Sequence, residues 1–297
     1  FGAVANVSVE NGNLVFTNLT SSPATPSSGK TLIHAFDYDS FFSPELDFIR
    51  YERDDGRVVD LMPDGRHVIQ TNWYGLNNTL HTVGFSSTNV GTLTVANEAA
   101  TNIYTKTRKV ELLITTASTT AVAGARASTN IMTVGSPVAN VGGFYLVFIG
   151  GRATGVATTT SRFFMGLSSS TAAPTDVEPS SITNIIGFGC DAADTNYQLM
   201  YRGTGAVTKV DLGASFPVET TDRSQLYKIQ LSSPPGTTQS VKYKVTKLSN
   251  NSVASGTITT NLPTTTTFLG PRIWASVGGT SSGIGLGFHR MQSLVYV

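Results

Sequence analysis

The chain has 297 residues, with 20 basic and 19 acidic side chains and a formal net charge of +1. This balance disfavours a nucleic-acid-binding or anionic-membrane-binding protein, because it gives no net attraction to phosphate. Charged residues make up 13% of the chain, against roughly 25% in ordinary soluble domains. The polar surface must therefore come from Ser, Thr, Asn and Gly, which suit strands and turns. No apolar run reaches the ~18 residues that a membrane helix needs.

The N-terminal segment predicts a β-hairpin. Residues 7–10 alternate apolar and polar side chains, residues 13–16 are mostly apolar, and Asn11-Gly12 lies between them. Asn-Gly is a strong hairpin signal, because both central turn residues need a positive φ. Residues 20–29 are rich in Ser, Thr, Pro and Gly and read as a linker. We therefore expect residues 1–29 to form an N-terminal arm.

Residues 30–104 predict a small β-rich domain with most of the acidic side chains. Arginines are interleaved with these acids, which is typical of a solvated, ion-paired surface or a subunit contact. The expected strands are 31–36, 46–50, 58–61, 67–71 and 91–95.

Residues 105–297 predict an antiparallel β-sandwich. The segment Val241-Lys-Tyr-Lys-Val-Thr-Lys-Leu248 would place apolar residues on one face of a strand and polar residues on the other. Antiparallel sheets commonly have one buried and one solvent-facing side. Helical periodicity is confined to two short stretches, 97–103 and 175–182, so we expect less than ~10% helix. The expected strands are 110–115, 129–134, 144–150, 162–167, 182–190, 197–201, 206–212, 226–232, 241–248, 253–260, 272–277 and 284–297.

Residues with catalytic or metal-binding chemistry are scattered. The four histidines lie in different expected strands without the spacing of a metal site. The one cysteine, Cys190, ends an apolar strand and reads as a core residue. A glycosidase needs two carboxylates facing each other across a cleft, and no such pair is evident. We predict no catalytic, cofactor or metal residues and no enzyme activity.

The loop after Cys190 carries Asp191, Asp194 and Asn196, for which two interpretations stay open. Asx side chains form turns with their own backbone, and closely spaced oxygens can also hold Ca²⁺. Trp274 and Tyr197 add aromatic rings, and sugars stack on exposed rings. Trp274, Asp191, Asp194, Asn196 and Tyr197 are the predicted receptor or glycan contacts.

An ordered series of motifs in residues 105–297 resembles a family of tailed-bacteriophage tail-fibre and tail structural proteins. The main runs are RFFMGLSSSTAAPTDVEPSS at 162–181 and TNIIGFGCDAADTNYQLMY at 183–201. Shorter matches follow in order at 211–217, 232–236, 256–263 and 268–274. The resemblance implies a concanavalin-A-like or jelly-roll β-sandwich. It carries over no catalytic residue.

The resemblance also predicts a function. We expect a structural virion protein of the tail or tail fibre that takes part in particle assembly and host attachment. Such a protein is assembled in the bacterial cytoplasm and then released with the particle. Its expected partners are itself, as a homotrimer, other phage structural proteins and a host cell-surface glycan.

Three alternatives stay open, namely a lectin-like glycan-binding receptor module, a capsid decoration protein and a polysaccharide depolymerase. Exposed aromatic rings beside polar loops would favour the glycan-binding module. Two carboxylates across a groove would favour the depolymerase.

Overall fold

The computed structural model describes the strands at 7–10, 13–16, 31–37, 47–53, 58–61 and 67–72 and the stretches 85–97, 110–139, 141–153, 160–218 and 225–295. The chain divides into two units, Phe1–Arg66 and His67–Val297. Each unit is described by itself, and the second contains every residue whose side chain is described.

The first unit contains two small antiparallel sheets. Strands β1 (Val7–Glu10) and β2 (Asn13–Phe16) pair with Glu10 opposite Asn13, so the predicted hairpin is confirmed. The second sheet has the order β3-β4-β5, with bounds Thr31–Asp37, Asp47–Arg53 and Val58–Leu61.

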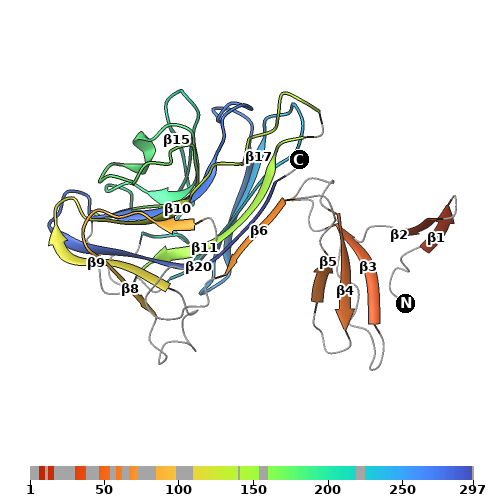
Figure 1. Ribbon diagram of the computed structural model, residues 1–297, viewed down its shortest axis with the longest axis horizontal. Coiled ribbons are helices and arrows are strands. Elements are labelled where there is room, and N and C mark those ends of the chain that lie inside the picture. The colour runs from red at the N-terminus through yellow and green to blue at the C-terminus, as the bar shows by residue number, and fades with distance from the viewer. Residues whose placement is uncertain are drawn as a thin grey trace. The chain divides into compact units, whose positions relative to one another are not determined.

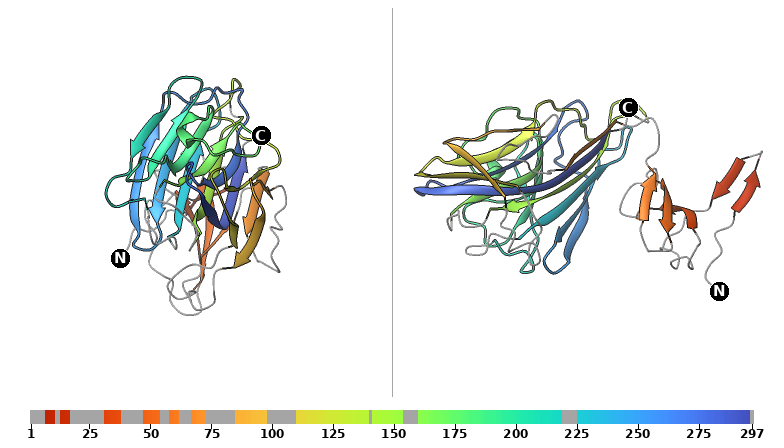
Figure 2. Two further views of the ribbon diagram at one scale, coloured as in Figure 1. Left: turned by 90° about the vertical axis from the view of Figure 1, so that its left-hand side faces the viewer. Right: turned by 60° about the horizontal axis from the view of Figure 1, so that its bottom comes forward.

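The second unit is a two-sheet antiparallel sandwich, as predicted (Figure 1). The first sheet has seven strands in the order β15-β14-β13-β12-β19-β10-β7. Their bounds, in that order, are Thr208–Asp211, Gln198–Arg202, Ile185–Cys190, Arg162–Ser168, Gly270–Ser276, Val122–Ala127 and Phe85–Ser87. The two further views in Figure 2 show the sheets as stacked layers.

The second sheet has eight strands in the order β18-β17-β16-β11-β20-β9-β8, and β6 also pairs with β20. Their bounds are Ser252–Ile258, Val241–Lys247, Tyr227–Ser233, Phe144–Arg152, Ser282–Val295, Val110–Ser118, Leu93–Asn97 and, for β6, His67–Asn72. The 14-residue β20 pairs with β11 along one edge and with β9 and then β6 along the other.

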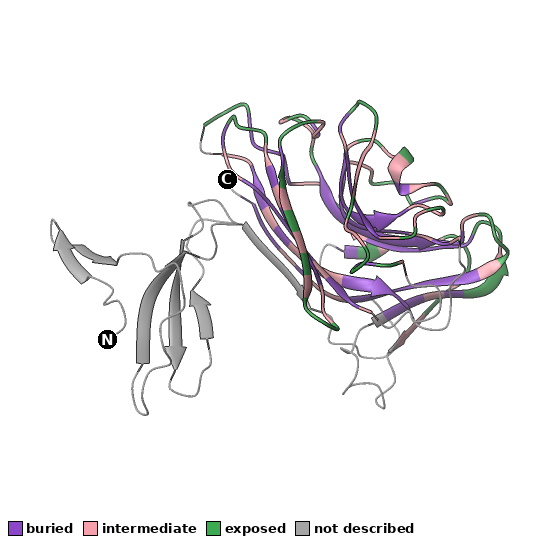
Figure 3. Ribbon diagram, turned by 180° about the vertical axis from the view of Figure 1, so that it is seen from behind, coloured by how far each residue is buried: buried purple, intermediate pink, exposed green. Residues whose placement is uncertain are grey.

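The main core lies between the two sheets (Figure 3). Val241, Tyr243 and Val245 of β17 are buried, whereas Lys242 and Lys244 are more exposed. The predicted alternation is therefore confirmed over 241–245, because period two sends successive side chains to opposite faces. Thr246, which was predicted to face solvent, is buried. Cys190 is fully buried in this core, as predicted.

Three features of the predicted domain plan differ from the structure. The sandwich begins at His67 and not at residue 105, because β6, β7 and β8 pair with β20, β10 and β9. The strand predicted at 129–134 is wrong, and the strand is instead β10. The helix predicted at 175–182 is reduced to one 3-10 turn, η2 (Pro179–Ser181).

No helix in the described part of the chain could span a membrane.

A second apolar cluster covers the outer face of the seven-stranded sheet, away from the main core. It contains Val122, Phe164, Ile185, Met200 and Trp274, all of them fully buried. The rings of Phe164 and Trp274 lie 4.6 Å apart between centroids. Loop residue Pro174 lies near this face, because its Cγ would be 3.2 Å from a Cβ built on Gly124. The segment 169–184 between β12 and β13 thus helps to cover a face that would otherwise expose apolar side chains.

Asp176 fastens this covering segment to the sheet and to the β19–β20 turn. Its Oδ1 accepts hydrogen bonds from Arg162 Nη1 at 2.6 Å and from the Gly278 amide at 2.9 Å. Its Oδ2 accepts one from the Gly279 amide at 2.7 Å. Burial alone would raise the pKa of Asp176, but the Ser276 hydroxyl, these amides and the Arg162 charge outweigh burial and lower that pKa.

We predict that Asp176→Asn lowers the free energy of unfolding by about 2 kcal/mol at pH 7, because it removes hydrogen bonds to a charged acceptor. A carboxyl with a lowered pKa stabilises the fold above its unfolded pKa, and this stability is lost as the pH falls through the folded value. Urea unfolding from pH 7 to pH 2.5 should therefore show the difference between wild type and variant closing in acid.

Asp211→Asn, at an exposed strand end, is the control for this measurement. A wild-type and Asp176→Asn difference that stays constant from pH 7 to pH 2.5 would contradict the role assigned to Asp176.

Candidate functional site

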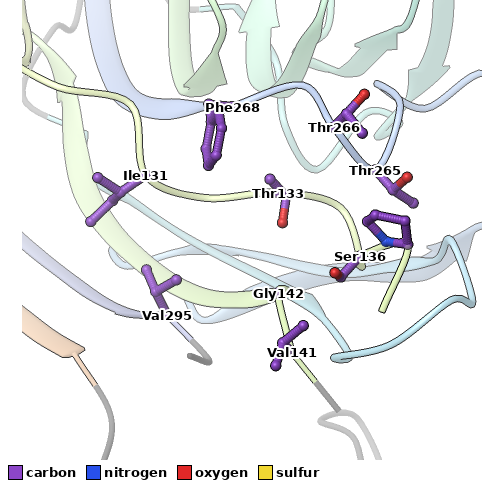
Figure 4. Close-up of a pocket in the computed structure, with 10 residues that line it drawn as sticks. Ile131, Thr133, Ser136, Val141, Gly142, Thr265, Thr266, Phe268 and Val295 are labelled. Atoms are coloured by element: carbon purple, nitrogen blue, oxygen red, sulfur yellow. The ribbon is translucent and has the colours of Figure 1, made fainter. Parts of the chain in front are cut away.

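An open pocket of about 540 Å³ lies at one end of the sandwich. Three parts of the chain line it, namely the segment after β10, the segment before β19 and the end of β20 (Figure 4). Ile131, Val141, Val295 and Phe268 supply its apolar walls. This position, at loops that join rigid strands, is where sandwich proteins most readily vary side chains without disturbing the core.

Phe268 is the exposed aromatic ring of the pocket, with 59% of its surface accessible. Its neighbour Leu269 exchanges backbone hydrogen bonds with Met132, at 3.0 and 2.7 Å. Leu269 and Met132 are both fully buried in the main core. Side chains alternate along extended chain, so fixing Leu269 inward turns Phe268 outward. In Figure 4 the ring points toward the space between Ile131 and Thr133.

Hydroxyl groups supply the polar chemistry of the pocket. They belong to Thr133, Ser136, Thr265 and Thr266. The Thr133 hydroxyl donates to the Gly135 carbonyl at 2.7 Å, and Ser136 Oγ accepts from the Val138 amide at 3.1 Å. Both oxygens keep further lone pairs for a ligand.

The residues that the structure describes around the pocket carry no charge. Its polar groups therefore suit an uncharged, polyhydroxylated ligand that combines an apolar face with several hydroxyls.

Gly142 allows the chain to turn at the pocket wall. Its φ is +70°, in the left-handed region that side chains disfavour. A Cβ there would lie 2.5 Å from the Gly135 carbonyl oxygen and 2.7 Å from the Ser136 Cβ. A larger residue at position 142 would therefore displace the segment that contains Ser136.

The two aromatic residues predicted as glycan contacts, Trp274 and Tyr197, are fully buried. Trp274 packs on Phe164 in the second apolar cluster. Tyr197 lies in the main core, with its ring centroid 4.5 Å from that of Phe188 and 5.0 Å from that of Tyr227. Neither ring has a face open to a sugar in this structure.

Three of the predicted receptor contacts, Asp191, Asp194 and Asn196, lie in the loop after β13, and the two aspartates face Lys209 of the edge strand β15. Lys209 Nζ is 2.9 Å from Asp191 Oδ2 and 2.6 Å from both carboxylate oxygens of Asp194. Asp194 Oδ2 also accepts the Asp191 amide at 2.8 Å, and the Asp194 amide donates to the Asp191 carbonyl at 3.2 Å, so the side chain and the backbone of Asp194 together close a turn. Asn196 donates instead to Asp211 Oδ2 at 3.2 Å. The turn interpretation therefore describes this loop, and a lysine ammonium balances its carboxylates.

Burial opposes the ionised forms in this cluster, and ion pairing outweighs it. Burial alone would raise the pKa of Asp191, but hydrogen bonds from Lys209 and Ser180 lower that pKa. Burial alone would lower the pKa of Lys209, but Asp194 and Asp191 raise it. Among the described residues, no group of three His, Cys, Asp or Glu side chains has the arrangement of a metal site.

The exposed ring of Phe268 was not predicted. Its sequence signal is an aromatic residue directly after Thr264–Thr267, in a segment between Pro263 and Pro271. The sequence thus places hydroxyl side chains beside one aromatic ring, and an exposed ring of this kind can serve as a stacking platform. Trp73 and Tyr74 are also aromatic and are adjacent in the sequence, and both lie outside the described residues.

We predict that Lys209→Met destabilises the protein most at neutral pH, because it removes the cation that faces the carboxylates of Asp191 and Asp194. The lowered pKa of Asp191 should return toward or above its ordinary value near 4, so protonation of Asp191 relieves the repulsion between the two carboxylates as the pH falls through that range. Urea unfolding at pH 7 and pH 4 measures this, with Lys247→Met on β17 as the matched control. An equal loss at both pH values would contradict the ion-pair account.

Comparison with known proteins finds matches to solved structures only, since no family model and no curated protein matches the chain. Peanut lectin with a 9-residue peptide is similar at 11% identity and a TM-score of 0.51, covering 78% of this chain and 99% of the lectin. A Shewanella oneidensis MR-1 protein of unknown function, SO2946, is similar at 11% identity and a TM-score of 0.50, covering 78% of this chain and 87% of that one. At such identities the likeness shows the fold, a lectin-like, concanavalin-A-like sandwich.

Proposed function

We propose that this protein is a carbohydrate-binding module and that the Phe268 pocket takes an uncharged sugar. The observation that carries the proposal is the Phe268 ring, 59% exposed on the wall of a pocket whose polar groups are hydroxyls. A pyranose has an apolar face that can stack on such a ring, and its rim of hydroxyls can bond to Thr and Ser. Peanut lectin shares the fold and is named a lectin, which supports the proposal.

The pocket fits a small ligand and not a long buried chain. Its volume of about 540 Å³ lies within the usual range of small-molecule sites, roughly 300–1,000 Å³. Its floor is rigid, because Met132 and Leu269 anchor both lining segments in the main core. A pre-formed site loses little conformational entropy when a ligand binds.

The particle role rests on the ordered motifs of residues 105–297 and stays a prediction. The homotrimer, the phage structural partners, the virion location and the lack of enzyme activity are likewise predictions. A glycan-binding sandwich is compatible with all of them, because three copies of a weak site on one fibre would add avidity.

We predict that Phe268→Ala weakens binding of neutral sugars by about tenfold, which corresponds to ~1.4 kcal/mol and to the upper part of the range for a stacked ring. The measurement is a glycan array followed by calorimetric titration of the strongest neutral ligand. Phe268→Trp should retain binding, because it keeps the stacking platform.

Val253→Ala is the matched control. Val253 is a 51% exposed apolar residue on β18 of the eight-stranded sheet, and it does not line the pocket. The proposal fails if no glycan binds to the wild type, or if Phe268→Ala and Val253→Ala have the same effect.

A further inference from the structure

Two arginines lie directly opposite each other on the outer face of the seven-stranded sheet. Arg126 of β10 is the register partner of Arg272 of β19. Their neighbours Ala125 and Ile273 are buried in the main core, so alternation places both arginines on the opposite face. Directly opposed side chains have Cβ atoms about 4.5–5.5 Å apart, and like charges in that position destabilise a sheet.

Arg272 is held firmly although only 2% of its surface is exposed. It donates to the Ser170 carbonyl at 3.1 Å and the Ala172 carbonyl at 2.7 Å. Its guanidinium carbon lies 5.0 Å from the ring centroid of Trp274. Burial, together with the nearby charge of Arg126, lowers the pKa of Arg272 to about 10. Neutral carbonyls fix the orientation of this cation and leave its charge uncompensated.

Neither arginine has an acidic partner in the part of the chain that the structure describes. The ion pairs there join Arg162 and Lys209 to acids elsewhere. The sequence from 73 to 84, which leads into β7 beside Arg126, contains no Asp or Glu. A buried charge without a counterion is costly, and the like charge of Arg126 beside the buried Arg272 adds to that cost.

The pair also has hydrogen-bond donors without acceptors. The Nε groups of Arg126 and Arg272 have no partner among the described residues. Arg126 uses only Nη1, which donates to the Ala127 carbonyl at 3.0 Å. Arginine presents five N–H donors in a planar fork that matches carboxylates and sulfate-like oxyanions.

The approach to the pair is open on the β7 side. Ser86, the register partner of Arg126 on β7, is exposed and brings a hydroxyl. Arg126 itself is partly exposed. On the other side, Arg272 is paired with Gly166 of β12, which has no side chain to supply a counter-charge. A ligand group entering beside Ser86 would thus contact Arg126, with Arg272 behind it.

We propose that Arg126 and Arg272 form a binding site for a small anionic group, a carboxylate or sulfate of the kind that acidic sugars carry. Arg126 contacts the group, Arg272 adds the charge behind it, and Ser86 donates its hydroxyl. This site does not depend on the proposed function, because the Phe268 pocket is lined by other, uncharged residues.

The first test is an NMR titration of the full chain, observing the arginine Nε–H signals. Sodium sulfate and sodium glucuronate are the two probes, each compared with sodium chloride at the same ionic strength. We expect saturable shifts of the Arg126 and Arg272 signals with at least one probe and none with chloride. Response to glucuronate alone identifies a carboxylate site, and response to both identifies a general oxyanion site. Saturation with neither probe overturns the proposal.

The second test locates the site by mutation. Arg126→Gln should weaken binding of the responsive probe by about tenfold or more, the loss expected for one charge-assisted contact. It should leave the unliganded thermal midpoint unchanged or higher, because it removes a like-charge contact. The affinity of Arg126→Lys for the probe should lie between those of wild type and Arg126→Gln, since lysine keeps the positive charge and lacks the planar guanidinium.

Lys228→Gln is the matched control, because Lys228 belongs to another basic group, with Lys244 and Arg290, in the other sheet. It should retain binding, as should Phe268→Ala. Loss of binding in Lys228→Gln with retention in Arg126→Gln overturns the assignment. Loss in Phe268→Ala would show instead that both probes enter the sugar pocket.

Discussion

The seven-stranded sheet has to be covered on both faces, and much of the sandwich unit follows from this constraint. Every residue of its interior strand β19 is buried. One face meets the main core through Ile273 and Ala275, and the other carries Trp274 with Phe164. An indole and a phenyl ring together remove a few hundred Å² of apolar surface from water, at roughly 25 cal/mol per Å². The second layer over this face is therefore part of the fold.

The covering segment 169–184 has almost no regular structure, so its own backbone satisfies only some of its polar groups. Side chains from the sheet and from the segment after β10 satisfy others. Arg272 binds the carbonyls of Ser170 and Ala172, and Arg202 binds those of Ser180 and Ser181, while Asn130 donates to the carbonyl of Ser169. Buried carbonyls need partners, and arginine can serve two of them with one side chain. This need explains why a buried strand carries a cation beside a tryptophan.

The sequence predicted the elements whose pattern is local. β17 alternates apolar residues with lysines over 241–245, so both its existence and its buried face could be predicted. β10 was missed because Val122-Ala-Gly-Ala-Arg-Ala127 has small residues on both faces. One of them, Gly124, is required because a Cβ there would lie 2.8 Å from the Thr88 carbonyl oxygen. The neighbouring run 129–134 has better strand residues but makes only the isolated bridge from Met132 to Leu269.

The candidate site could be predicted less well, because exposure is a tertiary property. Trp274 is the residue that a search for sugar platforms selects first, yet the segment from 169 to 184 helps to bury it. Phe268 is exposed because its neighbour Leu269 is buried in the main core, which turns Phe268 to the opposite side. The sequence shows an aromatic residue at both positions and cannot show which of them a distant loop covers. For Asp191 and Asp194 the sequence left a turn and a Ca²⁺ site both open, because their partner Lys209 lies 15 or more residues away.

The net charge of the whole chain hides a difference between its two units. The unit Phe1–Arg66 has ten acidic and five basic residues, a net charge of −5, whereas His67–Val297 has nine acidic and fifteen basic residues, a net charge of +6. The overall +1 therefore combines two units of opposite sign. Beyond about 8–10 Å, physiological salt screens exposed charges, so a ligand at the sandwich responds to the local excess of basic residues. Near-neutrality argued against a phosphate-rich polymer bound along the whole chain. It does not argue against a single carboxylate or sulfate held by two arginines at one place on the sandwich.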